Sequence, residues 1–524
     1  MGGAAGAATA RADVGREFLT GLALMLQVIS DSGSAPQHTA DVQRILAKAR
    51  EAQCAWHELA VSARLAVIRK FRRLLADRAE LVARTMAVPQ RRSLGETLTA
   101  EIMPLLESCR YLERVATRAL ARRRRVRWWS PLWLVRTRVV VQREPLGVVL
   151  IIAPSNYPLM LPGIQSLQAL VAGNAVLVKP GESGHASAHL LAELLTEAGL
   201  PAGLYTVLDE SVDSARAIMA QRVDKVLLTG SANTGRAVLR QLSTTLTPAA
   251  VELSGCDAVF VCADADFWQV ARALHFGLVL NGGATCIAPR RVFVPRTHLR
   301  SFEKHLRGEL AGAPVIVVGA QAADQVRVLV DDALASGARV LSGRVPDAER
   351  MTPLVLTDAS PEMAALQADV FAPMLCIVPV EDEEEALSFA RRCPYALGAT
   401  VFGGTRRARA LAQRVPAGVV VVNDMIVPTA DPRVPFGGYG DSGFGVTRGL
   451  EGLFELTRIK TIVMRGGRHR PHFEPISADT EELITAYLRA AYGYLYLDRL
   501  QAFAVVLRTA ARLQRTRRAG EKHS

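Results

Sequence analysis

Cys286 is the residue whose position first suggests chemistry. It follows the small residues Gly282, Gly283 and Ala284 in the stretch 281–290 (NGGATCIAPR). Two interpretations are open: an inert core thiol, which is the usual state of a lone cysteine, or a nucleophile that adds to a carbonyl carbon. The seven cysteines of the chain include no CxxC pair and no Cys/His cluster with zinc spacing. The sequence therefore predicts neither a disulfide framework nor a metal site.

Four other short segments precede this cysteine. They are 154–158 (PSNYP), 178–182 (VKPGE), 228–235 (LTGSANTG) and 251–255 (VELSG). Each lies at the end of a predicted strand, where asparagine and glycine are common simply because they form turns. A single segment predicts only a turn, whereas the ordered set indicates a site.

An alternating series of strands and helices positions these segments. The continuous apolar run 148–153 (VVLIIA) is typical of a strand buried on both faces. The βα rhythm predicts a parallel, doubly wound sheet, and its repetition after Gly255 predicts a second α/β domain. The expected strands are 148–153, 175–178, 205–208, 225–228, 259–262, 291–294, 315–318, 374–380 and 418–422, and the expected helices are 161–171, 186–198, 267–279 and 299–310.

The flanking regions have different patterns. Helical spacing of apolar residues predicts helices over 61–76 and 98–112, and the β-branched stretch 133–141 predicts a strand. The stretch 435–445 (PFGGYGDSGFG) contains so many glycines that we expect a loop. From Thr480 onward we expect a helix with one apolar face, which comprises Leu483, Tyr487, Leu488, Ala491 and Leu495.

Positive charge is concentrated in two regions of a chain whose net charge is +13. Residues 122–138 combine arginines with Trp128, Trp129 and Trp133, and residues 508–522 are rich in arginine. Such regions suit an anionic membrane surface, or they form an ordinary solvated surface. We expect no nucleic-acid partner, because no recognised binding motif accompanies the charge.

An apolar segment lies near the N-terminus, at residues 18–29 (FLTGLALMLQVI). Acidic residues precede it and no clear cleavage site follows, so it does not read as a secretory signal. It is also shorter than the roughly 20 residues that span a bilayer. We expect a helix packed on the protein or lying at a membrane interface. The expected location is cytoplasmic, with peripheral contact at the inner face of the membrane as the alternative.

Together the five segments resemble the aldehyde dehydrogenase superfamily over about residues 40–465. The stretch around Cys286 is similar to that family's cysteine motif, with Ala284 where glutamine is usual, and residues 435–445 are similar to its PFGG segment. The segments 246–253 (LTPAAVEL) and 286–289 (CIAP) resemble the corresponding sequences of the class 3 and fatty aldehyde dehydrogenase branch.

The resemblance implies an α/β fold with a Rossmann-like cofactor domain, a second α/β catalytic domain and a small bridging β element. The expected divisions are an N-terminal extension (1–39), an NAD(P)-binding domain (40–253, interrupted by bridging strands near 126–143), a catalytic domain (254–432), a loop and oligomerisation segment (433–466) and a helical basic tail (467–524).

The resemblance also implies the catalytic roles. Cys286 is the expected nucleophile, and Glu252 is the expected general base that activates water for thioester hydrolysis. The side-chain amide of Asn156 and the backbone N–H of Cys286 are the expected donors to the tetrahedral oxyanion. A free carboxylic acid is then the expected product, because CoA-acylating relatives usually lack this glutamate.

The implied cofactor is NAD, with NADP as the alternative. Glu182 would accept hydrogen bonds from ribose hydroxyls and repel a 2′-phosphate, and Gly230 and Ser231 would face the pyrophosphate at a helix N-terminus. The full set of expected cofactor residues is Ile152, Ser155, Lys179, Glu182, Gly230, Ser231, Asp369 and Phe371.

The resemblance leads us to expect a hydrophobic or long-chain aldehyde as substrate, a homodimer or homotetramer, and membrane contact through the basic and apolar termini. Several positions depart from the family pattern: Ser155, Ser254, Cys256, Asp369 and Ala372. Asp369 is one methylene shorter than the usual glutamate, so a looser hold on the cofactor is expected. Cys256 is read as a packed thiol, with a redox partner of Cys286 as the alternative.

Two other functions stay open. One is a dehydrogenase of the same fold with a different outcome, either CoA-acylating or specific for a semialdehyde. The other is a catalytically silent protein that kept the fold.

Overall fold

The computed structural model describes residues 39–86, 92–124, 134, 136–467, 470–473 and 475–520. Contacts divide the chain into two units, Met1–Arg123 with Val141–Lys460 and Arg124–Val140 with Thr461–Ser524. The apolar segment 18–29 and the tryptophans Trp128, Trp129 and Trp133 lie outside the described residues.

A six-stranded sheet forms half of the first unit, in the strand order β19-β7-β6-β3-β4-β5. Five of its strands are parallel, as the apolar runs predicted, and all five residues of β3 are buried. The chain winds outward from β3 in both directions, which opens a crevice at the carboxyl ends of β3 and β6. The strands are β3 (Val148–Ile152), β4 (Ala175–Lys179), β5 (Tyr205–Val207), β6 (Lys225–Gly230), β7 (Ala249–Leu253) and β19 (Gly443–Phe444).

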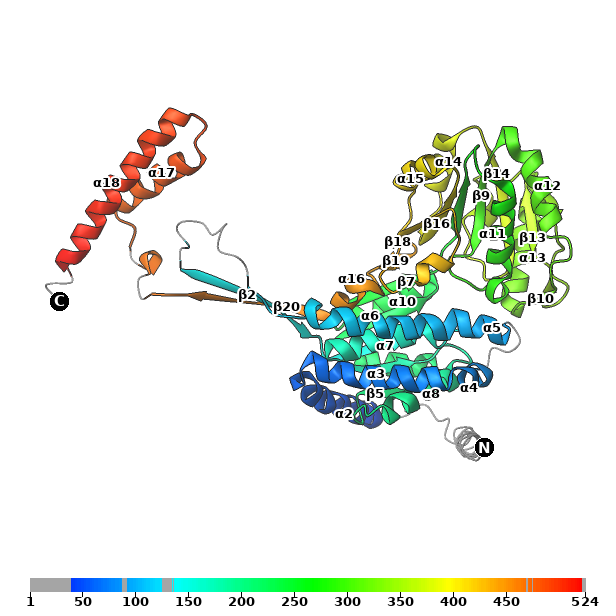
Figure 1. Cartoon of the computed structure of the whole chain (residues 1–524), viewed down its shortest axis with the longest axis horizontal. Coiled ribbons are helices and arrows are strands. Elements are labelled where there is room, and N and C mark those ends of the chain that lie inside the picture. The colour runs from blue at the N-terminus through cyan, green and yellow to red at the C-terminus, as the bar shows by residue number, and fades with distance from the viewer. Residues whose placement is uncertain are drawn as a thin grey trace, which may run out of the picture. The chain divides into compact units, whose positions relative to one another are not determined.

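Helices cover this sheet. The fully buried helix α7 (Met160–Ala172) crosses from β3 to β4, and Gly173 ends it in the left-handed conformation that glycine adopts without strain. Helices α3 and α6 lie beside α7 in a further layer (Figure 1). The other helices here are α2 (Thr39–Glu58), α3 (Val61–Asp77), α4 (Ala79–Thr85), α5 (Leu94–Thr97), α6 (Met103–Ala119), α8 (His185–Glu197), α9 (Val212–Ala220) and α10 (Ala232–Leu242).

One turn of the expected helix 98–112 is not α-helical. Residues Leu98–Ile102 form a π-helical turn, η1, between α5 and α6. Both Glu101 and Ile102 are buried there. Single π turns inside helices are frequent at functional sites, because the extra residue redirects a side chain.

The second sheet of the first unit has seven strands in the order β11-β13-β14-β9-β8-β16-β17. All are parallel except β11, which confirms the second α/β region. Its strands are β8 (Asp257–Val261), β9 (Pro289–Pro295), β11 (Arg339–Ser342), β13 (Leu354–Thr357), β14 (Met374–Val380), β16 (Gly398–Phe402) and β17 (Val419–Val422), and its helices are α11 (Phe267–Val279), α12 (Leu299–Glu309), α13 (Ala320–Ala335), α14 (Glu383–Ala390) and α15 (Thr405–Ala412).

The glycine-rich stretch 435–445 was expected to be loop, and that expectation is wrong in part. It contains β18 (Tyr439–Gly440), which pairs with β15 (Tyr395–Ala396), and β19, which pairs antiparallel with β7 so that Gly443 lies opposite Glu252. Gly443 has φ 93°, and a Cβ there would clash with the Val251 carbonyl oxygen. Glycine is what permits this close strand pairing.

Short elements complete the first unit. They are β10 (Ile316–Val317), β12 (Arg350–Met351), α16 (Gly449–Glu455) and the 3₁₀ turns η4 (Leu280–Gly283), η5 (Arg296–His298), η6 (Ala364–Leu366) and η7 (Val427–Ala430). The expected strand 315–318 is thus only two residues long, and it pairs with β12.

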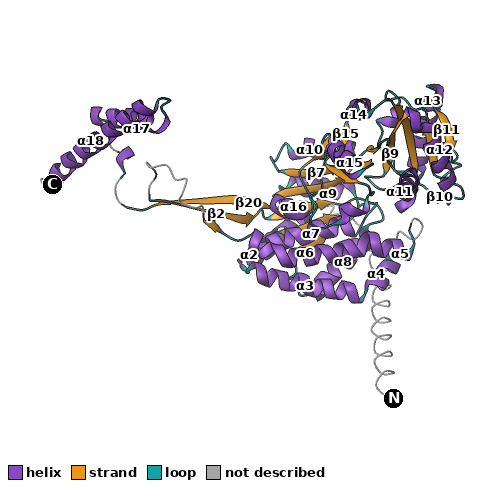
Figure 2. Ribbon diagram, turned by 45° about the horizontal axis from the view of Figure 1, so that its top comes forward, coloured by secondary structure: helices purple, strands orange, loops and turns teal. Residues whose placement is uncertain are grey.

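A small three-stranded sheet contains β1 (Arg123–Arg124), β2 (Thr137–Pro145) and β20 (Thr457–Arg465) in that order. Strands β2 and β20 run side by side in Figure 2. The strand predicted at 133–141 begins at Thr137 and ends four residues later than expected, at Pro145. Strand β2 of this sheet overlaps the region near 126–143 where bridging strands were expected.

The second unit contains two helices after the turn η8 (Pro471–Phe473): α17 (Ala478–Tyr492) and α18 (Tyr496–Gly520), which contact each other. Of the apolar face expected there, Leu488 and Leu495 are exposed, and the buried contact residue is Ala486 instead. Within the described part of the chain, no helix is both long enough and apolar enough to cross a membrane.

Candidate active site

The loop that carries Cys286 connects η4 to β9. Asn281 (φ 51°) and Gly282 (φ 61°) are left-handed. A Cβ added to Gly283 would lie 2.5 Å from the Pro373 nitrogen, so only glycine fits against that backbone. The small residues that drew attention in the sequence therefore let the loop pack tightly, and Cys286 emerges from it partly exposed.

Two cavities meet at Cys286. The first, of about 360 Å³, lies at the carboxyl ends of the six-stranded sheet and is called the strand-end cavity. The second, of about 750 Å³, is called the apolar cavity. Cys286, Glu252 and Leu161 line both. The apolar cavity takes its name from Met103, Pro104, Met160, Phe276, Val279, Leu280, Ile287, Ile426, Val427 and Phe436.

Glu252 is held at this junction by the glycine-rich stretch. It lies on β7 opposite Gly443, and its Oε2 atom accepts a hydrogen bond from the Thr447 hydroxyl (2.8 Å). Its Oε1 atom is buried and has no hydrogen-bond partner among the described residues. One carboxylate oxygen is thus anchored and the other is available for a proton.

Arg448 supplies positive charge beside Glu252. The guanidinium is buried, lies over the Phe436 ring (4.1 Å to the ring centre) and donates to the Thr429 carbonyl oxygen (2.8 Å). Its Nε atom lacks a partner within the described part of the chain. No ion pair with Glu252 is formed there, although the two charges interact.

Burial changes both acidic groups at the junction. It raises the pKa of Glu252, while the charge of Arg448 and the Thr447 hydrogen bond oppose the rise. Burial also raises the pKa of the Cys286 thiol, and the negative charges of Glu252 and Asp257 raise it further. The resting thiol is therefore protonated, and the neighbouring carboxylate is a base of increased strength.

Asn156 lies directly after β3 and its side chain is buried. One N–H of its side-chain amide donates to the Ala284 carbonyl oxygen (3.0 Å), and its Oδ1 accepts from the Tyr157 backbone N–H (3.0 Å). An amide nitrogen carries two N–H groups, so one remains for another acceptor. Asn156 is tied by these bonds to the loop before Cys286.

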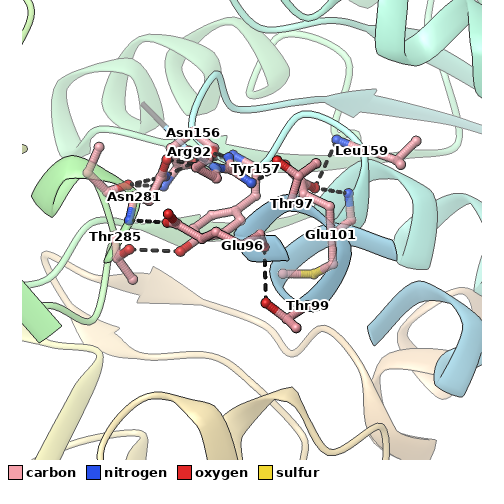
Figure 3. Close-up of polar contacts among 12 residues, drawn as sticks. Arg92, Glu96, Thr97, Thr99, Glu101, Asn156, Tyr157, Leu159, Asn281 and Thr285 are labelled. Atoms are coloured by element: carbon pink, nitrogen blue, oxygen red, sulfur yellow. Dashed lines mark hydrogen bonds and ion pairs between the residues drawn. The ribbon is translucent and has the colours of Figure 1, made fainter. Parts of the chain in front are cut away.

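A buried polar cluster that the sequence did not predict surrounds Asn156 (Figure 3). Arg92 and Glu101 are paired at 2.8 Å with no exposed side-chain surface. Arg92 also donates to Asn281 Oδ1 (2.8 Å) and to the Asn156 carbonyl oxygen. Burial raises the pKa of Glu101, and Arg92 opposes the rise. A signal existed, since Glu101 is a charged residue among the apolar positions of 98–112.

The sequence matches the model of the aldehyde dehydrogenase family over residues 32–462. The chain belongs to the aldehyde dehydrogenase family. Members bound to NAD and to NADP have the same fold, and the chain is an NAD(P)-dependent oxidoreductase of aldehydes.

Known aldehyde dehydrogenases and their relatives align with most of the chain. The 4,4'-diapolycopene aldehyde oxidase of Methylomonas sp is 30% identical, over 86% of this chain and 87% of that protein. A candidate NADP-dependent succinate-semialdehyde dehydrogenase of Mycobacterium ulcerans is 33% identical, over 80% of this chain and 84% of that protein. The NAD-bound aldehyde dehydrogenase of Mycobacterium tuberculosis superposes with a TM-score of 0.75 at 26% identity, and covers 82% of this chain and 92% of that one.

Five of the expected cofactor residues of this aldehyde dehydrogenase line the strand-end cavity: Ser155, Gly230, Ser231, Asp369 and Phe371. The other three, Ile152, Lys179 and Glu182, do not line it. Ile152 and Lys179 end β3 and β4 side by side, and Glu182 is exposed in the following turn. Burial lowers the pKa of Lys179, which Glu210 and Asp209 oppose.

The residues that depart from the family pattern make specific contacts with their neighbours. Ser254 Oγ donates to the Gly230 carbonyl oxygen (3.3 Å), and Ser254 opposes the rise in the pKa of Asp369 that burial causes. The Ala372 carbonyl oxygen accepts from the buried Arg290 (2.6 Å). Cys256 is buried, and its thiol donates to the Leu366 carbonyl oxygen (3.6 Å), as expected of a packed thiol.

Proposed function

We propose that this aldehyde dehydrogenase oxidises a hydrophobic aldehyde to a carboxylic acid, with Cys286 as nucleophile, Glu252 as general base and Asn156 as oxyanion donor. The observation that carries the proposal is the junction: Cys286 and Glu252 line both the strand-end cavity and the apolar cavity. An aldehyde in one cavity and a nicotinamide cofactor in the other would meet at the thiol.

The reaction follows from these groups. Glu252 takes the thiol proton as sulfur bonds to the aldehyde carbon, and the carbonyl oxygen becomes an oxyanion near Asn156. A bound nicotinamide cofactor would supply the hydride acceptor, so loss of hydride from that carbon would leave a thioester on Cys286. Glu252 then passes the thiol proton to solvent and accepts a proton from the water that adds to the thioester. Cleavage of the carbon–sulfur bond releases the acid, and the departing sulfur of Cys286 takes up the proton from Glu252.

The residues of the strand-end cavity fit NAD, with NADP as the alternative. Ser231 caps helix α10, whose N-terminus would face a pyrophosphate beside Gly230. Lys179 ends β4, Glu182 lies in the turn after it, and both would contact a ribose. Asp369 and Phe371 would contact the second ribose from the other α/β region.

The apolar cavity supports a hydrophobic substrate. Its lining is dominated by large apolar side chains, and it is about twice the volume of the strand-end cavity (about 750 against 360 Å³). Burial of apolar surface contributes roughly 25 cal/mol per Å², so a longer aldehyde gains binding free energy there. A relative named for an aldehyde of diapolycopene agrees with this proposal.

A second candidate substrate is an acidic semialdehyde. Arg448 also lines the apolar cavity, and its buried Nε atom is unpartnered among the described residues. A guanidinium in this position can bind a substrate carboxylate. A relative named for succinate semialdehyde gives this alternative weight.

The test is NADH or NADPH formation over a ladder of aldehydes, from acetaldehyde to long-chain and aromatic ones, with succinate semialdehyde included and Cys286→Ala as control. Values of kcat/KM that rise with chain length and vanish in the variant support the proposal. Preference for the semialdehyde favours the second candidate. A thioester product would overturn both, and absence of turnover with either cofactor would indicate a silent protein.

The exposed surface of α17 and α18 supports a peripheral membrane contact. Apolar and aromatic side chains are exposed along both helices, among them Leu488, Tyr492, Leu497 and Phe503, while Arg508 and Arg515 add positive charge. Such a surface suits an anionic bilayer. Sedimentation with phosphatidylserine vesicles should capture the full chain and not a variant truncated at residue 470. Equal capture of the two would contradict the proposal.

Strand β20 supports a homo-oligomer. Ile459, Ile462, Val463 and Met464 are exposed apolar residues on one strand, a composition that suits pairing with a second copy. Light scattering should give a dimer or tetramer, and Ile459→Lys with Val463→Lys should shift the mass toward the monomer. A monomeric wild type would contradict this.

A further inference from the structure

Arg92 joins three groups in the buried cluster of Figure 3 through three different nitrogens. Nη1 pairs with Glu101, Nε donates to Asn281 Oδ1, and Nη2 donates to the Asn156 carbonyl oxygen. The guanidinium also lies 4.7 Å from the centre of the Tyr157 ring. Such a planar fork holds its partners at fixed angles, which a lysine ammonium cannot reproduce.

The hydrogen bonds around Arg92 tie two distant segments together. The Asn156 carbonyl oxygen accepts from both Arg92 and Asn281 Nδ2 (3.0 Å from the latter). The Ala284 carbonyl oxygen accepts from the side-chain amides of Asn156 (3.0 Å) and Asn281 (3.2 Å). The Tyr157 and Thr285 hydroxyls add a further bond (2.8 Å). The residues after β3 are thereby fixed against the residues before Cys286.

Glu101 extends the cluster to helix α7. Its Oε2 atom accepts the backbone N–H groups of Met160 (2.6 Å) and Leu159 (3.3 Å), at the start of that helix. A carboxylate there interacts favourably with the helix dipole. The anchor of the cluster is therefore a fully buried helix, which moves little.

We propose that Arg92, with Glu101 as its counter-ion, is a positioning residue that directs the remaining N–H of the Asn156 amide toward the oxyanion. This rests on the role of Asn156 in the proposed function. Arg92 contacts neither cavity directly and acts through Asn156 and Asn281. Without the Arg92 guanidinium, the Asn156 side-chain amide is no longer held in a fixed orientation relative to the Cys286 loop. The oxyanion of the transition state then loses a hydrogen-bond donor.

The experiment compares Arg92→Met and Arg92→Lys with wild type, and Arg72→Met is the matched control because it removes a partly buried ion pair with Glu113 that lines neither cavity. The Arg92 variants should lose kcat by roughly 10- to 100-fold, while the cofactor dissociation constant stays within about twofold. Arg72→Met should keep wild-type kcat. Combining Arg92→Lys with Asn156→Ala should give a rate no lower than Asn156→Ala alone, because one interaction is lost in both.

Wild-type kcat in Arg92→Lys, or multiplicative loss in the double variant, would overturn the proposal. If Arg92→Met does not fold, Arg92→Lys decides. Hydrogen exchange gives a readout that needs no turnover: Arg92→Lys should speed exchange within 156–160 and 281–286 and not in α12. Unchanged exchange there would refute the positioning role even if wild type oxidised no aldehyde, a result that would count against the proposed function alone.

Discussion

Two buried arginine–glutamate arrangements flank Cys286, and they differ in how fully their hydrogen bonds are made. Arg92 and Glu101 form a direct pair, and neither has a buried side-chain atom that lacks a partner within the described chain. In the same part of the molecule, Glu252 Oε1 and Arg448 Nε are buried and unpartnered. A buried polar group without a partner is costly, so a substrate that hydrogen-bonds these two atoms would be bound more tightly.

This contrast separates two tasks. The satisfied pair gains its stability from geometry and gives rigidity, as a fully connected polar network does. In the second arrangement Glu252 and Arg448 form no ion pair, and burial raises the pKa of Glu252 while the charge of Arg448 opposes the rise. The same two residue types therefore have two roles. Arg92 and Glu101 give a rigid support, and Glu252 beside Arg448 is a reactive group.

The largest effect should come from Glu252→Gln. This change removes the proposed base, and general base catalysis contributes roughly 10²- to 10⁴-fold. We expect kcat for NADH formation to fall by that range while the thermal midpoint stays close to wild type. Glu113→Gln is the control, because Glu113 lines neither cavity. A loss in kcat below tenfold would show that Glu252 is not the base.

Glu101→Leu should cost stability instead. It leaves the Arg92 charge buried without its counter-ion, which typically costs about 3–5 kcal/mol. The free energy of unfolding, measured by urea denaturation, should fall by that amount. Glu80→Leu breaks an exposed pair with Arg84 and should change the free energy of unfolding by less than about 1 kcal/mol. Equal losses of unfolding free energy in the two variants would mean that the buried pair stabilises the fold no more than an exposed pair does.

Arg448→Met should alter the pH dependence. Removing the positive charge raises the pKa of Glu252 further, and a general base acts only when deprotonated. The acidic limb of the kcat/KM profile, measured from about pH 5 to 9, should therefore move to higher pH. Arg272→Met is the matched change, since Arg272 lines the same cavity without contributing to the pKa of Glu252. A shift to lower pH would contradict the assignment.

Thr447→Val should have the smallest effect. It removes one hydrogen bond to Glu252 Oε2 and leaves the carboxylate less well oriented, so we expect kcat to fall about two- to tenfold, in line with the roughly 0.5–1.5 kcal/mol that a typical hydrogen bond contributes. Thr447→Ser keeps the hydroxyl and should restore most of the rate. If serine behaves like valine, the methyl group rather than the hydroxyl matters.

Sequence patterns predicted the fold well where the chain is locally consistent. Helix 267–279 and strand 374–380 have the predicted limits, because long apolar runs in parallel sheets and amphipathic helices are recognisable without distant partners. The glycine-rich stretch was misread because a high glycine content normally indicates loop, whereas here it permits β19 to approach β7.

Among the site residues, too, some were predictable from the sequence and others were not. Glu252 and Asn156 lie in motifs at strand ends, and Cys286 lies in a loop rich in small residues, so sequence motifs indicated all three. Arg92 did not stand out, because its role depends on Asn281, which is 189 positions away. A buried arginine is distinguished from a surface arginine only by partners that the fold brings to it, and nothing in its own neighbourhood indicates them.

The π-helical turn Leu98–Ile102 has a consequence for how this chain tolerates length changes. A π turn holds one residue more than an α turn, and each helical residue advances the direction of side chains by roughly 100°. Deleting the exposed Thr99 would restore a regular helix and keep the apolar face of α6. It would also turn everything before it, so Glu101 and Arg92 would no longer face each other. A one-residue deletion that leaves the fold intact could thus disconnect the site from its support.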